Sequence, residues 1–119
     1  MEIEIKRKPY YESRLYIGSQ KSDLTSFDQS DLEKYIRGFQ SESKEIIPVR
    51  ITPIVFLSGN NYREDGWEIS AINYPKIDTN SIDIESFMNK LAKALLDRFD
   101  QKRVCVVDSN QIVMYVDKK

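Results

Sequence analysis

Apolar residues recur along the chain with two different periods, and the changes of period predict where helices and strands lie. In residues 81–100 they recur every three or four positions, which indicates a long amphipathic helix. A shorter helix is predicted over 30–40, where Ser30 and Glu33 form a capping box ahead of a second apolar stripe. That stripe consists of Leu32, Tyr35, Ile36 and Phe39.

Alternation of apolar and polar residues, which has a period of two, and short runs of β-branched residues predict the strands. They cover residues 2–8, 13–18, 45–58, 67–74, 104–107 and 112–116. Residues 59–66 are the strongest turn signal in the chain, so residues 54–74 should form a long antiparallel hairpin. Pro48 and Pro53 both lack an N–H group, and we therefore expect a bulge or kink near Thr52 and Pro53.

The order of these elements predicts one α+β domain that spans residues 1–119. Its core is a ferredoxin-like β-α-β-β-α-β antiparallel sheet with two helices on one face, and extra edge strands are added at both termini. Each predicted helix has a single apolar stripe, so both helices can cover the same face of the sheet. The opposite face and the strand edges then need other protection, which predicts a homo-oligomer.

This element order resembles the broad group of small ferredoxin-like proteins that includes the PII-like signalling proteins. The resemblance covers most of the chain and lies in the order of its elements. The residues that bind ligands in PII-like proteins are not recognisable in this sequence. The resemblance therefore implies a fold, and it assigns no site residue.

Charge balance and residue types narrow the classes of function. The chain has 18 basic and 19 acidic side chains and a net charge of −1, which argues against a nucleic-acid partner. It has no histidine, and Cys105, its only cysteine, lies in an apolar run. We therefore expect no metal site, no cofactor and no disulfide, with Cys105 as a buried small side chain. No apolar run reaches the roughly 18 residues of a membrane span, and we expect a cytoplasmic protein without a membrane partner.

The tip of the predicted hairpin, residues 60–67, is the first candidate for a binding site. Tyr62 and Trp67 offer flat aromatic surfaces there, and Arg63 offers a cation that can pair with an anion. In the alternative interpretation the tip is a plain polar turn and Trp67 is tucked into the sheet. If the tip binds nothing, the open face of the sheet around Tyr16 and Tyr74 is the next candidate.

Other charged pairs are interpreted as solvated surface. Glu64 and Asp65 are adjacent on a turn, where side chains diverge, and Asp97 and Asp100 lie on the exposed side of the long helix. The basic pair at 102–103 is explained by its position at a helix end, where cations are favoured.

No motif in the sequence names a reaction, so function is predicted by class. The leading prediction is a non-enzymatic binding or regulatory protein that acts as a homo-oligomer and binds a partner protein or a small anionic ligand. The first alternative is a small metal-independent enzyme that uses tyrosine, arginine and carboxylate groups. The second alternative is a sheet-based nucleic-acid binder, which would use an aromatic sheet face.

Overall fold

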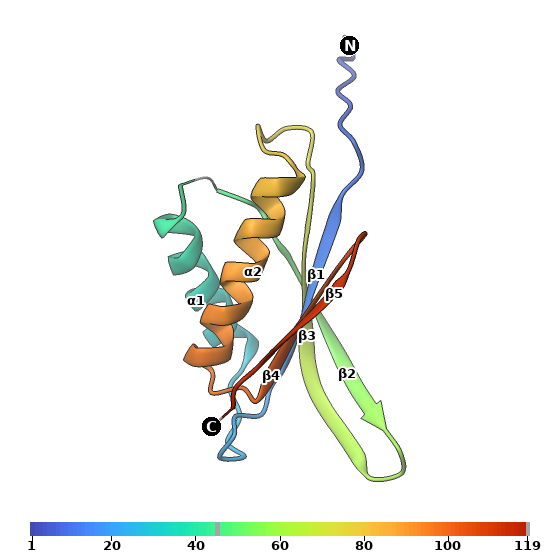
Figure 1. The fold of residues 1–119 in the computed structure, drawn as a ribbon. Helices are drawn as coiled ribbons and strands as arrows, with labels where there is room; N and C mark the ends of the chain where they lie inside the picture. Colours follow the sequence, from blue (N-terminus) through green and yellow to red (C-terminus); the bar gives the residue numbers. More distant parts are fainter. Residues whose placement is uncertain (45, 119) are drawn as a thin grey trace.

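The computed structural model describes residues 1–44 and 46–118, which form a five-stranded sheet and two helices (Figure 1). Neighbouring strands are antiparallel throughout, in the order β2-β3-β1-β4-β5. This confirms the predicted α+β class, with an antiparallel sheet and two helices. The elements are β1 (Glu12–Gly18), α1 (Gln29–Glu42), β2 (Arg50–Ser58), β3 (Tyr62–Ile72), α2 (Ser81–Arg98), β4 (Arg103–Asp108) and β5 (Ile112–Val116).

Both helices lie on one face of the sheet, as Figure 1 shows. Helix α2 packs on β4 and β1, and its stripe includes the fully buried Leu91 and Leu95. The sheet meets this layer with alternate residues of its central strands, such as Leu15 of β1 and Ile69 of β3. Because the side chains of a strand alternate between faces, the residues between these two rows point away from the helices.

Helix α1 begins earlier than the sequence pattern predicted. Its N-cap is Asp28, whose side chain accepts a hydrogen bond from the N–H of Asp31 at 2.9 Å. In return, the N–H of Asp28 donates to the carboxylate of Asp31. The predicted cap, Ser30, lies inside the first turn instead. The two carboxylates also lie next to the positive pole of the helix dipole, where negative charge is stabilising. This explains why the aspartate pair forms the capping box.

The strand predicted over residues 2–8 is wrong. This segment has no regular structure, and Ile3 and Ile5 are 75% and 69% exposed. Alternation decides which side chains share a face, but a strand also needs a partner for its backbone. The chain enters the sheet at β1, which lies between β3 and β4 and therefore has both edges occupied.

The bulge predicted near Pro53 is also wrong. Strand β2 pairs with β3 without interruption from Arg50 to Ser58, and Pro53 lies opposite Trp67. Because β2 is an edge strand, the missing N–H of Pro53 faces away from β3 and no ladder hydrogen bond is lost. Pro48 precedes the strand, and Glu45, where the apolar stretch was taken to begin, lies outside the described residues. The hairpins over 54–74 and 104–116 are confirmed.

Candidate functional site

The face of the sheet that the helices leave open carries a hollow of about 810 Å³. It lies across β1, β2, β3 and β4, and its wall includes Tyr16, Phe56, Tyr62, Glu64 and Arg103. These residues come from four separate strands, and each points away from the helices because of the alternation along its strand. This surface is called the sheet-face hollow below.

Two tyrosine–glutamate pairs lie on this face. The hydroxyl group of Tyr16 donates to Oε1 of Glu68 at 2.9 Å, between directly opposite residues of β1 and β3. The hydroxyl group of Tyr62 donates to Oε1 of Glu64, two residues further along the same strand. Both glutamates are half-buried. The open face therefore presents two carboxylates whose positions are held by neighbouring tyrosines.

A glycine allows the carboxylate of Glu64 to lie against the backbone of β1. A side chain at Gly18 would overlap the Glu64 carboxylate, since the position of the missing Cβ is filled by that group. The backbone N–H of Gln20 donates to Oε2 of Glu64 at 2.9 Å. Glu64 is thus held from both ends, by a backbone donor on one oxygen and by Tyr62 on the other.

The tyrosine hydroxyls of the hollow are strong candidates for neutral hydrogen-bond donors. The hydrogen bond to Glu64, followed by partial burial, raises the pKa of Tyr62 above its usual value, although the charge of Arg103 opposes this shift. Partial burial and the bond to Glu68 raise the pKa of Tyr16 in the same way. Both hydroxyls stay protonated at neutral pH, so the negative charge of the site is carried by the glutamates.

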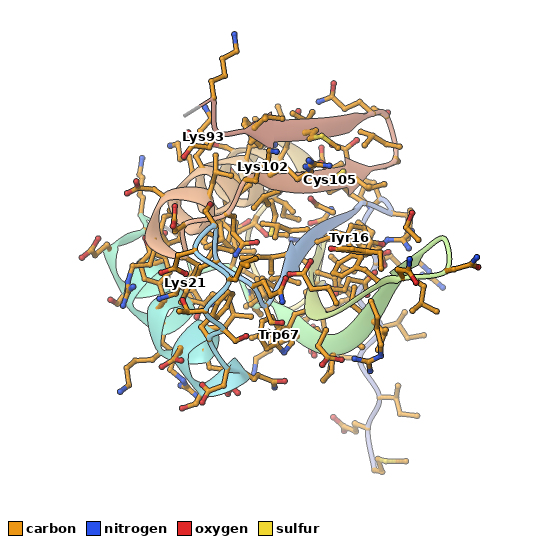
Figure 2. All side chains as sticks on the ribbon, turned by 90° about the horizontal axis from the view of Figure 1, so that it is seen from below. Tyr16, Lys21, Trp67, Lys93, Lys102 and Cys105 are labelled. Atoms are coloured by element: carbon orange, nitrogen blue, oxygen red, sulfur yellow. The ribbon has the colours of Figure 1, made fainter. Side chains whose placement is uncertain are left out.

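Basic and apolar groups complete the wall. Lys21, Lys102 and Arg103 line one end of the hollow, while Leu24 and Met114 add apolar surface. Figure 2 shows Tyr16, Lys21, Lys102 and Cys105 as seen along the sheet from this end.

Cys105 lines the same hollow, directly opposite Tyr16 on the neighbouring strand. It is half-buried, and this burial raises the pKa of its thiol. The sequence predicted a buried small side chain; the alternation of β4 instead buries Val104 and Val106 and turns Cys105 outward. A thiol with a raised pKa is a weak nucleophile at neutral pH, so Cys105 forms part of the wall.

This arrangement suits a ligand with charges of both signs and a flat ring. Carboxylates attract a cationic group, and the faces of tyrosine rings add a cation–π attraction. Lysine and arginine in the same wall attract a carboxylate or another anion. The ring of Phe56 and the apolar wall can stack against a flat heterocycle.

The structure separates the three residues predicted at the hairpin tip. Tyr62 lines the sheet-face hollow, but Arg63 lies on the other face and pairs with Asp65 at 3.1 Å. Trp67 is only 7% exposed; it packs against Phe27 in the core. Tyr62 and Trp67 therefore do not stack, and Trp67 has the tucked position of the alternative interpretation. The role of the tip in binding stays a prediction.

Glu64 and Glu68 were not predicted as candidate site residues, because Glu64 was grouped with its neighbour Asp65 instead of with residues two positions apart. Positions 62, 64 and 68 have the same parity and share a face, while Asp65 has the opposite parity. The even-numbered polar residues of β3 were the available signal. Asp97 and Asp100 are exposed at the end of α2, as expected. Across the described residues, no three metal-binding side chains cluster, and no helix is long and apolar enough to cross a membrane.

Comparison with known proteins identifies solved structures with the same fold. No protein-family model and no curated protein matches the sequence. A phage SAM lyase in complex with S-methyl-5'-thioadenosine superposes with a TM-score of 0.75 at 14% identity, over 99% of this chain and 98% of the other. A phage SAM lyase in the apo state gives 0.73 at 16% identity, over 92% and 90%.

These similarities show a shared fold, and both of these solved structures are of a SAM lyase, which is an enzyme. They contradict the leading prediction of a non-enzymatic binding or regulatory protein. That prediction rested on the absence of histidine, metal ligands and known motifs, which removes common catalytic groups but leaves tyrosine and carboxylates in place. The alternative of a small enzyme fits the comparison better.

Proposed function

We propose that this protein is an enzyme that cleaves S-adenosylmethionine and releases S-methyl-5'-thioadenosine, with the sheet-face hollow as its active site. The main support is the likeness of fold along nearly the whole of both chains to a SAM lyase that holds this thioadenosine. The second support is the residue composition of the hollow. Glu64 lies in its wall and Glu68 lies beside it, hydrogen-bonded to Tyr16. These carboxylates, the basic residues and the aromatic rings correspond to the sulfonium, the carboxylate and the adenine of the substrate.

The proposed reaction breaks the bond between the sulfonium sulfur and the side-chain carbon of the amino-acid part. Both electrons of that bond go to sulfur, which leaves as the neutral thioether. The carbon fragment completes its valence through its own carboxylate oxygen, which bonds to that carbon and closes a lactone ring. This route needs only the substrate, so the protein's work is to bind, orient and exclude water.

Each group of the hollow has a proposed role in holding the substrate. Glu64 and Glu68 attract the positively charged sulfonium and ammonium groups, and the rings of Tyr16 and Tyr62 stand beside them. Arg103 binds the substrate carboxylate, which leaves Phe56 to stack on the adenine. Because the sulfur loses its charge as the bond breaks, the attraction to the carboxylates fades and the product is released more readily.

Substitution of the two glutamates tests this proposal. Glu64→Gln and Glu68→Gln keep the size of the side chain and remove its charge. Each variant should lower kcat/KM for release of S-methyl-5'-thioadenosine at least about tenfold, a loss of about 1.4 kcal/mol of transition-state binding relative to free enzyme and substrate. Asp97→Asn is the matched control, since it neutralises an exposed carboxylate on the opposite side of the molecule.

Chromatography of the products, with thermal melts to show that each variant is folded, gives the readout. If both glutamine variants are as active as Asp97→Asn, the hollow is not the active site. If wild type itself fails to cleave the compound, the proposed reaction is wrong.

Three finer predictions from the sequence continue as proposals. The order β2-β3-β1-β4 with a helix in each crossover supports a ferredoxin-like core, with β5 as the added edge strand at the C-terminus. The sheet and both helices share one hydrophobic cluster, which supports one domain over 1–119. An enzyme that uses S-adenosylmethionine also agrees with the predicted cytoplasmic location.

A further inference from the structure

The N-terminal segment has the pattern of a strand but pairs with no strand of its own chain. Residues 1–10 extend away from the sheet and the helices in Figure 1, and Ile3 and Ile5 are largely exposed. Lys8 fixes the base of this segment, because its amino group donates to the carbonyl oxygens of Ile77 and Thr79, the latter at 2.7 Å. The anchor holds the segment beside the β3–α2 connection, on the far side of β1 from β5.

The edge strand β5 offers an open row of backbone groups. The N–H of Asp108 donates to the carbonyl of Gln111, and the N–H of Asp117 donates to the carbonyl of Lys102. By the alternation of an antiparallel ladder, the backbone groups of Ile112, Met114 and Val116 then point away from β4. The side chains of these three residues are 70%, 54% and 50% exposed. An exposed apolar edge of this kind is a template for another strand.

The other edge of the sheet is less suited to accept a strand. In β2 the backbone groups that face away from β3 include those of Pro53, which has no N–H to donate. Proline on an edge strand is a common way to block pairing between chains. The described part of β5 has no proline, and its outward side chains are all apolar.

The charges of the N-terminal segment and of the β5 edge favour antiparallel over parallel pairing. The segment is acidic at its start, with Glu2 and Glu4, and basic over residues 6–8. Lys93 and Lys102 lie near the C-terminal end of β5, at the end of the β4–β5 hairpin away from its turn (Figure 2). An antiparallel strand places the two glutamates near these lysines.

The other end of β5 is acidic. Asp108 flanks the turn before β5, and Glu85 accepts from Gln111 in that turn. In the antiparallel direction the basic residues 6–8 reach this end. Ile3 and Ile5 then extend the apolar row of Ile112, Met114 and Val116.

We infer that residues 2–6 of one copy add as an antiparallel strand to the β5 edge of a second copy. Each chain thereby donates one strand and accepts one. The backbone hydrogen bonds supply the affinity, while the isoleucines and the charge pairs fix the register. This inference is independent of the proposed activity.

Mass measurement in solution tests the exchange. Wild type at tens of micromolar should sediment with at least twice the 14.0 kDa mass of one chain. Ile3→Lys combined with Ile5→Lys should shift the mass to that of one chain while the melting temperature of the fold persists, since both side chains are exposed. Leu24→Lys is the matched control, because it adds a lysine at another exposed apolar residue and should leave the mass unchanged.

A second variant tests the accepting edge. Met114→Pro removes an outward N–H and should also give the mass of one chain, whereas Val55→Pro on β2 should not. A wild-type mass of 14.0 kDa would overturn the inference. So would an assembly that survives in the double lysine variant, which would place the contact on the open sheet face.

Discussion

Gly18 and Gly66 lie opposite each other on β1 and β3, yet their missing side chains serve different purposes. A Cβ at Gly66 would overlap the carbonyl oxygen of Ile17 and the ring of Phe56. For a Cβ at Gly18, the three nearest atoms would all belong to the carboxylate group of Glu64. Backbone cannot move aside cheaply, whereas the end of a glutamate side chain can rotate. One glycine is therefore required by the fold and the other by the site.

We predict different effects for alanine at these two positions, on stability at Gly66 and on ligand binding at Gly18. Gly66→Ala should lower the free energy of unfolding by about 1–3 kcal/mol, the usual cost of overpacking. Gly18→Ala should cost less stability but should displace Glu64 and weaken binding of the positively charged S-adenosylmethionine about tenfold or more. Urea denaturation and isothermal titration measure the two quantities. Equal losses of stability with unchanged binding by Gly18→Ala would show that the position of Glu64 does not matter.

Tyr11 makes stability depend on pH in the alkaline range. Burial, together with the nearby carboxylate of Asp108, raises the pKa of its hydroxyl above the usual value of about 10. The unfolded chain therefore loses this proton at a lower pH than the folded protein does. The associated stabilisation is fully present below about pH 10 and is lost as the pH rises through the folded pKa.

The prediction is a fall in the free energy of unfolding of wild type above about pH 10, with a shallower fall in Tyr11→Phe. Part of the slope should remain in the variant, since the pKa values of Tyr16 and Tyr62 are also raised. Denaturant titrations at a series of alkaline pH values provide the comparison. Parallel curves for the two proteins would contradict this assignment.

At the level of elements, the two helix starts are set by side chains that cap rather than by the apolar stripes. Asp28 caps α1 and Asn80 caps α2. In each case the backbone N–H of the cap residue donates to the side chain of an aspartate three residues later. Asp28→Ala should cost about 1 kcal/mol of stability, while Ser30→Ala should cost less than about 0.5. Thermal or urea unfolding checks this, and the reverse order would restore Ser30 as the cap.

The buried stripe of α2 gives a second prediction at this scale. Leu91 and Leu95 are fully buried against the sheet, so replacing either with alanine should cost about 2–5 kcal/mol. Lys90→Ala on the exposed side should cost under about 0.5 kcal/mol. Similar thermal shifts for the three variants would place the wrong face of α2 in the core.

The comparison between sequence and structure shows which elements a pattern can specify. Helix α2 and the β4–β5 hairpin were predictable because many residues repeat with one period. Residues 2–8 carried the same alternation and yet have no partner in the chain. Pro53 suggested a bulge only because its position at the edge of the sheet depends on strand order, which no local pattern reveals.

The candidate site was harder to predict than the fold, because its members are far apart in sequence. Tyr16 and Glu68 meet only after β1 pairs with β3, and Arg103 joins the same face through the pairing of β1 with β4. Within β3, however, parity alone separates Glu64 and Glu68 from Trp67. Applied consistently, the period of two would have placed both carboxylates on the open face and Trp67 in the core.

On the scale of the whole molecule, the two faces of the sheet have different roles. The covered face holds the hydrophobic cluster and accounts for stability, which leaves the open face free to carry charge. The strands that contribute to it are held by antiparallel pairing, so the site is built on rigid elements. The β5 edge of the same sheet is the surface that we propose for assembly.

The most direct test of this account is to incubate purified wild-type protein with S-adenosylmethionine and follow both compounds by chromatography and mass spectrometry. The account predicts that S-methyl-5'-thioadenosine appears as the substrate disappears, in equal amounts and over many turnovers per protein molecule. Loss of S-adenosylmethionine at the rate of a protein-free control would contradict it.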